Sequence, residues 1–217
     1  MAQRLVVRLI PLEAFVLAAL LGYLLTGLHL IPLRPVELSL PSAPQAANPS
    51  RPLAVSPVFT PEVRRWEPEI QAWAAAYSLD PNLVATVMQI ESCGDPQAVS
   101  GSGAQGLFQV MPFHFAADEN MLDPETNAAR GLGYLARALE LSSGQVGLAL
   151  AGYNGGHSQI GRDASLWPDE TRRYYYWGAG IYEEARAGAA QSPRLAEWLA
   201  AGGASLCARA AQQLGMQ

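Results

Sequence analysis

The sequence predicts a mostly α-helical domain preceded by a membrane-spanning segment and a proline-rich spacer. Apolar residues recur at helical spacing through the second half of the chain, for example at Ile70, Trp73, Ala74 and Tyr77. Two Asp-Pro pairs, at 80–81 and 123–124, each supply an N-cap followed by proline at the first helical position. No stretch alternates convincingly between apolar and polar residues as a β-strand does.

The composition allows a real core and limits the choice of partner. Hydrophobic residues make up 50% of the 217 positions. The net charge of −5 argues against a nucleic acid held through its phosphates.

The first 33 residues predict a signal anchor. Arg4 and Arg8 precede an apolar run, and residues 14–33 contain no Asp, Glu, Lys or Arg. Twenty such residues are enough to cross a hydrocarbon layer about 30 Å thick, whereas the apolar core of a cleavable signal peptide usually has roughly 7–15. We therefore favour a single-pass anchor in the cell membrane, with the N-terminus in the cytoplasm and the following domain outside. The alternative is secretion after cleavage near "APQAA" (43–47).

Residues 34–61 predict a spacer, and residues 62–217 one globular domain. Seven prolines among serine, alanine and asparagine make the first segment semi-extended. In the second, we expect long loops at 94–106 and 112–126. The expected helices lie around 70–77, 81–91, 124–142, 146–151, 170–189 and 194–211.

Cys93 and Cys207 could form a disulfide in an exported domain, although the sequence cannot show that they meet. Two cysteines and three scattered histidines (29, 114 and 157) do not indicate a metal site, and no cofactor is expected.

Glu91 is the first candidate for chemistry because it ends an apolar helix face. On a helix it shares that face with Val84, Val87 and Met88. Burial disfavours the charged carboxylate and raises its pKa. A carboxylic acid that keeps its proton near neutral pH is what general acid catalysis requires. From these residues alone, an exposed glutamate at a frayed helix end is the alternative.

Two glycine-rich segments place polar side chains where a ligand can approach. The stretch "SGSGAQGLFQVMP" (100–112) carries Ser100 and Gln109, and "AGYNGG" (151–156) carries Tyr153 and Asn154. Glycine permits tight turns and close approach of the backbone to a ligand. Turn formation alone explains Asn154 and the glycines, but it does not explain Tyr153.

Six motifs follow one another between Glu91 and Tyr174, in a resemblance that covers about residues 67–177. They are Glu91-Ser92; Asp95-Pro96-Gln97-Ala98-Val99-Ser100; Gly103 to Pro112; Asp123-Pro124 with Asn127, Gly131, Tyr134 and Leu135; Gly152 to Gly156; and Pro168, Glu170, Thr171 and Tyr174. In this order they resemble the soluble lytic transglycosylase (SLT) catalytic domain family, which has a helical fold like that of goose-type lysozyme. The chain differs at Phe108, where methionine is usual, at Gly152, where alanine is usual, and at Gly94, where relatives often carry an aromatic residue. The last difference predicts a more open cleft.

The resemblance implies an enzyme of the bacterial envelope, a lyase acting on peptidoglycan glycan strands. Glu91 would protonate the β-1,4 oxygen between N-acetylmuramic acid and N-acetylglucosamine, then take the proton of the muramic acid 6-hydroxyl, giving a 1,6-anhydro ring. No second carboxylate is compelling, and Glu170 is interpreted as a helix-terminal charge.

Six further residues are expected around the sugar by the same resemblance: Ser100, Gln109, Met111, Tyr153, Asn154 and Tyr174. Core packing is the alternative for Met111. Two other functions stay open at this point, namely a lysozyme-type hydrolase of the same fold and a non-catalytic glycan-binding module of the envelope. Residues 178–217 carry no recognisable motif.

Overall fold

A computed structural model describes residues 54–216. The expected anchor and most of the expected spacer lie outside these residues, and within them no helix is both long and apolar enough to cross a membrane. The predicted mostly α-helical class is confirmed, since the regular elements of the described part are helices, and its only β structure is two isolated bridges in a loop.

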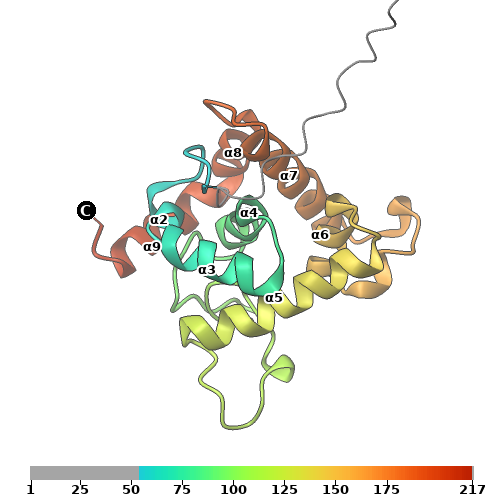
Figure 1. Cartoon of the computed structure of the whole chain (residues 1–217), viewed down its shortest axis with the longest axis horizontal. Coiled ribbons are helices and arrows are strands. Elements are labelled where there is room, and N and C mark those ends of the chain that lie inside the picture. Colours follow the sequence, from blue (N-terminus) through green and yellow to red (C-terminus); the bar gives the residue numbers. More distant parts are fainter. Residues whose placement is uncertain (1–53, 217) are drawn as a thin grey trace, which may run out of the picture. The chain divides into compact units, whose positions relative to one another are not determined.

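The helices of the described part are shown in Figure 1. They are α2 (Pro61–Arg64), α3 (Glu67–Tyr77), α4 (Pro81–Glu91), α5 (Pro124–Leu141), α6 (Val146–Gly155), α7 (Asp169–Arg186), α8 (Pro193–Trp198) and α9 (Ala204–Gln213). Single turns of 3-10 helix are η1 (Pro112–His114), η2 (His157–Gln159) and η3 (Ala164–Leu166), and the π-helical turn η4 (Leu199–Gly203) follows α8.

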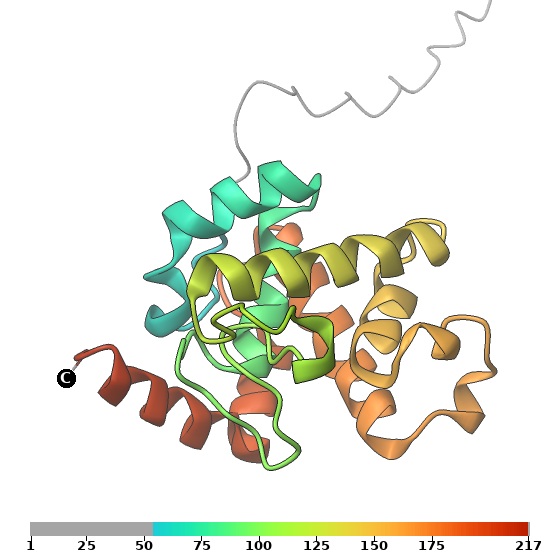
Figure 2. The same cartoon turned by 90° about the horizontal axis from the view of Figure 1, so that it is seen from below.

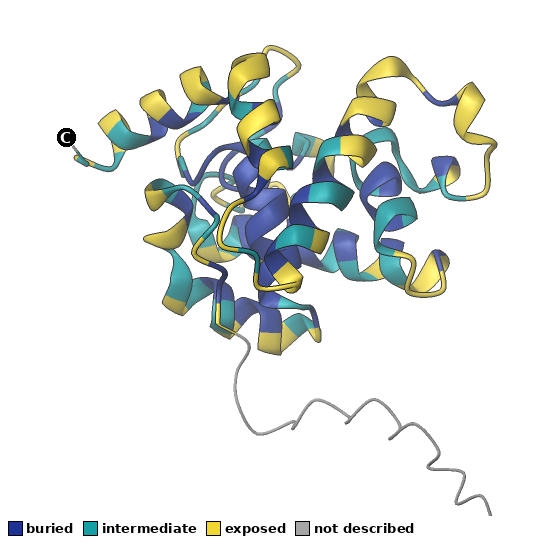
Figure 3. Ribbon diagram, turned by 90° about the horizontal axis from the view of Figure 1, so that it is seen from above, coloured by how far each residue is buried: buried dark blue, intermediate teal, exposed yellow. Residues whose placement is uncertain are grey.

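Helix α4 is the buried centre of the domain. Every residue from Pro81 to Gln89 is buried, and the helix packs against α2, α3 and α7. In Figure 3 it is the dark blue helix enclosed by the others. The helix starts as predicted, because the Asp80 carboxylate accepts a hydrogen bond from the Asn82 backbone N–H at 2.8 Å. A helix that is apolar on nearly all sides requires such enclosure.

The loops between α4 and α5 are held against α5, as Figure 2 shows for the green segment. The buried Asn127 side chain accepts from the Phe108 N–H at 2.9 Å and donates to the carbonyls of Gln105 and Met121 at 2.8 and 2.9 Å. One α5 side chain therefore satisfies three backbone groups of two separate loop segments.

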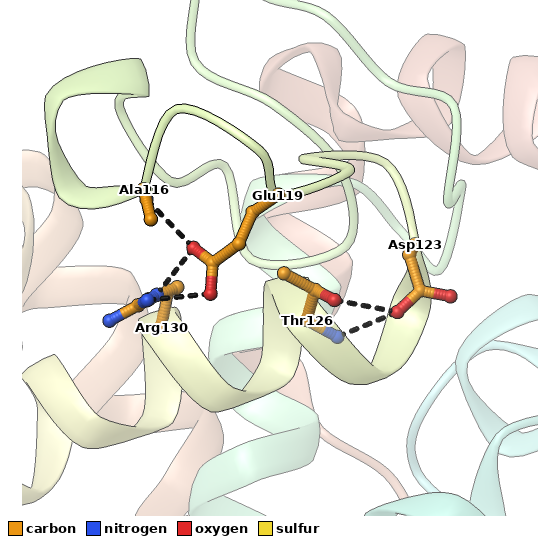
Figure 4. A network of polar contacts seen from close by, with 5 residues as sticks. All are labelled: Ala116, Glu119, Asp123, Thr126 and Arg130. Carbon is orange, nitrogen blue, oxygen red and sulfur yellow. Dashed lines mark hydrogen bonds and ion pairs between the residues drawn. The ribbon is translucent and has the colours of Figure 1, made fainter.

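Figure 4 shows how the rest of this loop reaches α5. Asp123 caps the helix by accepting from both the N–H and the hydroxyl of Thr126. The Glu119 carboxylate accepts from the Ala116 N–H and forms an ion pair with Arg130 at 2.6 Å. These contacts, above all that with Arg130, lower the pKa of Glu119.

Two predicted helix limits were wrong. Helix α6 continues through Tyr153 and Asn154 to Gly155, and the chain leaves the helix only at Gly156, which has a φ of 88°. A Cβ at Gly155 would lie 2.5 Å from Thr171 Oγ1, so glycine allows this close approach to α7. The helix expected over 194–211 is divided into α8 and α9, since Gly202 takes a φ of 128°.

The domain also begins earlier than position 62. Val55 and Phe59 are buried in the core, and the Ser56 N–H donates to Asn82 Oδ1 at 2.8 Å. The last residues of the expected spacer therefore belong to the folded domain.

A buried disulfide joins Cys93, just after α4, to Cys207 on α9. Helix α9 buries only two of its own residues, Cys207 and Ala210. The covalent bond is therefore a principal attachment of α9, and it joins this helix to the chain two residues beyond Glu91.

Replacing both cysteines with serine should destabilise the domain. The bond closes a loop of 114 residues, for which the chain-entropy account gives a loss of roughly 4–5 kcal/mol. Urea unfolding of the purified protein measures it. Wild type in dithiothreitol should show a similar loss and the double variant should be insensitive to the reductant. Equal midpoints for oxidised wild type and double variant would contradict this role.

Candidate active site

A cleft of about 390 Å³ lies at the C-terminal end of α4. Its walls come from the loop after α4, the turn η1, helix α5, the end of α6 and the start of α7. Six of the seven predicted site residues line it, namely Glu91, Ser100, Gln109, Met111, Tyr153 and Asn154. The chain thus brings together side chains that are up to 63 positions apart (154 − 91).

Glu91 combines partial accessibility with a desolvated carboxyl group. The residue opens to the cleft, yet protein atoms surround its carboxyl so densely that burial raises the pKa from 4.5 to about 8. The Tyr174 hydroxyl opposes this shift, and the negative charge of Glu170 adds to it. Glu91 therefore carries a proton at neutral pH, as expected for a carboxyl at the end of an apolar helix face.

Tyr174 lies behind the acid and does not line the cleft. Its side chain is buried, and burial together with the charge of Glu91 raises the pKa of its phenol well above the usual value. Within residues 54–216 its hydroxyl has no partner at standard hydrogen-bond geometry, so its contact with Glu91 is close but not an ideal hydrogen bond. The sequence predicted Tyr174 in the wall, whereas in the structure it is buried next to Glu91 and is not part of the lining.

Tyr153 is fixed by the loop and not by the acid. Its phenol donates to the Phe108 carbonyl at 2.7 Å, and burial, followed by the charge of Glu91, raises its pKa. Helix α5 passes close to both Phe108 and the Tyr153 hydroxyl, and glycine at position 131 makes this approach possible. A Cβ at Gly131 would lie 2.7 Å from Phe108 Cβ and 3.0 Å from the Tyr153 hydroxyl.

The chain turns sharply after Glu91. The buried Ser92 hydroxyl donates to the Leu107 carbonyl at 2.7 Å and accepts from the Gly94 N–H at 3.1 Å. Gly94 has a φ of 84°, and a Cβ there would lie 2.8 Å from the Glu62 carbonyl and 3.2 Å from the Trp66 ring. Gly94 is thus covered by α2 and Trp66 and is not part of the lining, so the expectation that it opens the cleft was wrong.

The other polar lining residues are partly engaged by the fold. The Gln109 amide donates to the carbonyls of Ala98 and Gly106 at 3.1 and 2.9 Å, and the Ser100 hydroxyl accepts from the Ala104 N–H at 2.9 Å. Asn154 Oδ1 accepts from the Thr171 hydroxyl at 2.9 Å. The Asn154 NH2 group makes no hydrogen bond within the described part of the chain, so it can donate to a ligand.

Comparison with known proteins now gives the family. Residues 68–175 match the model of the transglycosylase SLT domain. The chain belongs to this family. A transglycosylase of Enterobacteria phage PRD1 is 39% identical over 112 residues, which are 51% of this chain and 40% of that protein. An endo-type membrane-bound lytic murein transglycosylase A of Klebsiella pneumoniae is 33% identical over 98 residues, 37% of this chain and 48% of the relative.

Among solved structures, the chain is similar to an inactive mutant of lytic transglycosylase Slt from Pseudomonas aeruginosa. The two share 25% identity with a TM-score of 0.47, over 59% of this chain and 25% of that one. The chain spans less than half of the length of the phage and Klebsiella relatives.

Several lining residues of the SLT domain were not predicted as site residues. Glu170, interpreted as a helix-terminal charge, is indeed in the first turn of α7 but also lines the cleft. Tyr134 belongs to the motif that begins at Asp123-Pro124 but was assigned no function, and it also lines the cleft. Ser102, Phe113 and His114 also line the cleft. No local signal marks Phe113 or His114, because their place depends on how η1 packs beside α5.

Gly131→Ala should destabilise the domain, with Gly133→Ala as its matched control. At 131 the new methyl group meets Phe108 Cβ, and relieving this overlap should cost roughly 1–3 kcal/mol. At 133, in the same helix, its nearest neighbour within 4 Å is Tyr77 at 3.9 Å, so alanine should gain up to about 1 kcal/mol of helix propensity. Urea unfolding measures both, and equal shifts in one direction would contradict the close approach.

Glu91→Gln should stabilise the domain, and increasingly so as the pH rises from 5 to 8. The unfolded carboxyl ionises near 4.5 and the folded one only near 8, so wild type loses stability across this window. The difference should reach on the order of 3 kcal/mol at pH 7. Unfolding free energies of both proteins at each pH provide the test. A difference independent of pH would show that Glu91 is ionised normally.

Proposed function

We propose that this protein is a lytic transglycosylase that cleaves glycan strands of peptidoglycan with Glu91 as its single acid and base. The observation that carries the proposal is the position of the Glu91 carboxyl, which protein atoms enclose at an accessible cleft and whose pKa burial raises to about 8. The names of the phage and Klebsiella relatives support the reaction and the substrate class.

The proposed reaction uses one proton-carrying group twice. Glu91 donates its proton to the oxygen between N-acetylmuramic acid and N-acetylglucosamine, and the bond from C1 to that oxygen breaks. The resulting carboxylate then takes the proton of the muramic acid 6-hydroxyl, whose oxygen bonds to C1. The product carries a 1,6-anhydro ring, no water is consumed, and Glu91 is again protonated. Intramolecular attack gains effective molarity from proximity.

The neighbours of Glu91 suit both halves of this cycle. Glu170 repels the ionised form of Glu91 and so favours the acid that starts the reaction. The Tyr174 hydroxyl acts in the opposite direction and eases the transient carboxylate. In this proposal Asn154 donates its free NH2 to an acetamido or hydroxyl oxygen of the sugar. Ser100, Gln109, Met111 and Tyr153 shape the wall around it.

A lysozyme-type hydrolase is the second candidate, and Glu170 is the observation that favours it. Two-carboxylate glycosidases use a second carboxylate as nucleophile or as base for water. Glu170 is an exposed carboxylate in the same cleft as the acid. Its exposure to solvent in the cleft would let it reach a water molecule at the sugar.

The buried disulfide supports an extracytoplasmic location, since such bonds persist in oxidising compartments. The name of the Klebsiella relative includes "membrane-bound". We therefore propose a domain that works at the envelope, tethered through the apolar segment of residues 14–33.

Mass spectrometry of the muropeptides released from purified sacculi tests the proposal. Wild type and Glu170→Gln should both release products with 1,6-anhydro ends, and Glu91→Gln should lose activity by about 10²–10⁴-fold. Reducing ends whose formation depends on Glu170 would establish the hydrolase instead. If wild type releases nothing, a non-catalytic glycan-binding module is the better account.

A further inference from the structure

Phe113 is held in solvent at the rim of the cleft. Its side chain is 75% exposed, more than any other large hydrophobic residue in the range 54–216, and it lines the cleft. The turn η1 fixes its position, with hydrogen bonds from His114 N–H to the Met111 carbonyl and from Phe115 N–H to the Pro112 carbonyl at 3.0 and 3.1 Å. Phe115 packs on the core while Phe113 does not. Core packing therefore does not explain a phenylalanine at 113.

Aromatic rings connect Phe113 with the surroundings of Glu91. The centroids of Phe113 and His114 are 4.5 Å apart, those of His114 and Tyr134 4.9 Å, and those of Tyr134 and Tyr153 5.9 Å. All four residues line the cleft. The series thus runs along the wall of the cleft, from its rim to the tyrosine beside the acid.

His157 supports this series from its other side. Its ring stacks on Tyr134 with a centroid distance of 3.8 Å, and its Nε2 lies 3.1 Å from the Tyr134 carbonyl oxygen. Burial, together with His157, lowers the pKa of His114 and so favours the neutral form of the imidazole next to Phe113. The series therefore offers uncharged ring faces to a ligand.

We propose that Phe113, backed by His114 and Tyr134, forms a sugar-stacking subsite that binds a glycan residue beyond the bond at Glu91. The proposal rests on the proposed function. A pyranose ring has a face of C–H groups that packs on an aromatic face, while its hydroxyl groups point outward to water. The lining contains the carboxyl groups of Glu91 and Glu170 and no arginine or lysine, so a neutral sugar suits this wall better than a phosphate-bearing ligand.

This subsite makes the affinity depend on strand length. A short oligosaccharide that occupies only the sites at Glu91 does not reach Phe113. A longer strand does, and it gains the stacking contact. Removing the ring should therefore weaken the binding of long strands more than that of short ones.

The binding of glycan strands to the full-length Glu91→Gln protein tests the subsite. This variant is used because it should bind the strands without cleaving them. Calorimetry with peptide-free peptidoglycan strands should show a Kd about 3- to 10-fold higher when Phe113→Ala is added. Phe113→Trp should hold the Kd within about twofold of the parent. Leu166→Ala is the matched control, because Leu166 is 61% exposed but lies outside the lining. It should leave the Kd unchanged.

A Kd for Phe113→Ala that stays within about twofold of the Glu91→Gln parent overturns the subsite. An equal loss of affinity in Leu166→Ala overturns it too, and so does a parent protein that binds no glycan strands. The proposed function has a separate readout. Equal cleavage of sacculi by wild type and Glu91→Gln would overturn it, whatever the Phe113 variants do. Thermal unfolding of each variant confirms that a change in Kd does not reflect loss of the fold.

Discussion

The carboxyl group of Glu91 is surrounded by protein at the point where the buried helix α4 meets the cleft. Ionising such a group costs free energy because water no longer solvates the charge. The neighbours do not remove that cost, since Tyr153 directs its hydroxyl to Phe108 and Glu170 adds a like charge. The acid therefore keeps its proton, and the domain gives up part of its stability to hold it.

The rest of the scaffold can be understood as holding this one group in place. The three residues that follow Glu91 are each fixed by a different contact. Ser92 bonds to the loop at Leu107, Cys93 is joined to α9, and Gly94 accepts a hydrogen bond from the Trp66 indole at 2.9 Å. These attachments come from separate parts of the chain, so the position of the acid does not depend on α4 alone.

Local signals in the sequence predicted the central helices well. Asp80-Pro81 and Asp123-Pro124 act through neighbouring residues, and both start helices in the structure. Contacts between residues far apart in the sequence could not be predicted from such local signals. The close approach of Gly155 to Thr171 depends on how α6 packs on α7, and the pairing of Cys93 with Cys207 depends on where α9 packs. The same holds in the site, where Tyr174 lies behind the cleft and Phe113 on its rim.

The pKa of Glu91 is the quantity on which this account depends most. Carboxyl-carbon NMR of the protein labelled at glutamate measures it directly, and the resonance that disappears in Glu91→Gln assigns the signal. We expect this carboxyl to titrate at about pH 8. A titration near the ordinary value of 4.5 would contradict it, because Glu91 would then be ionised at neutral pH and have no proton to donate.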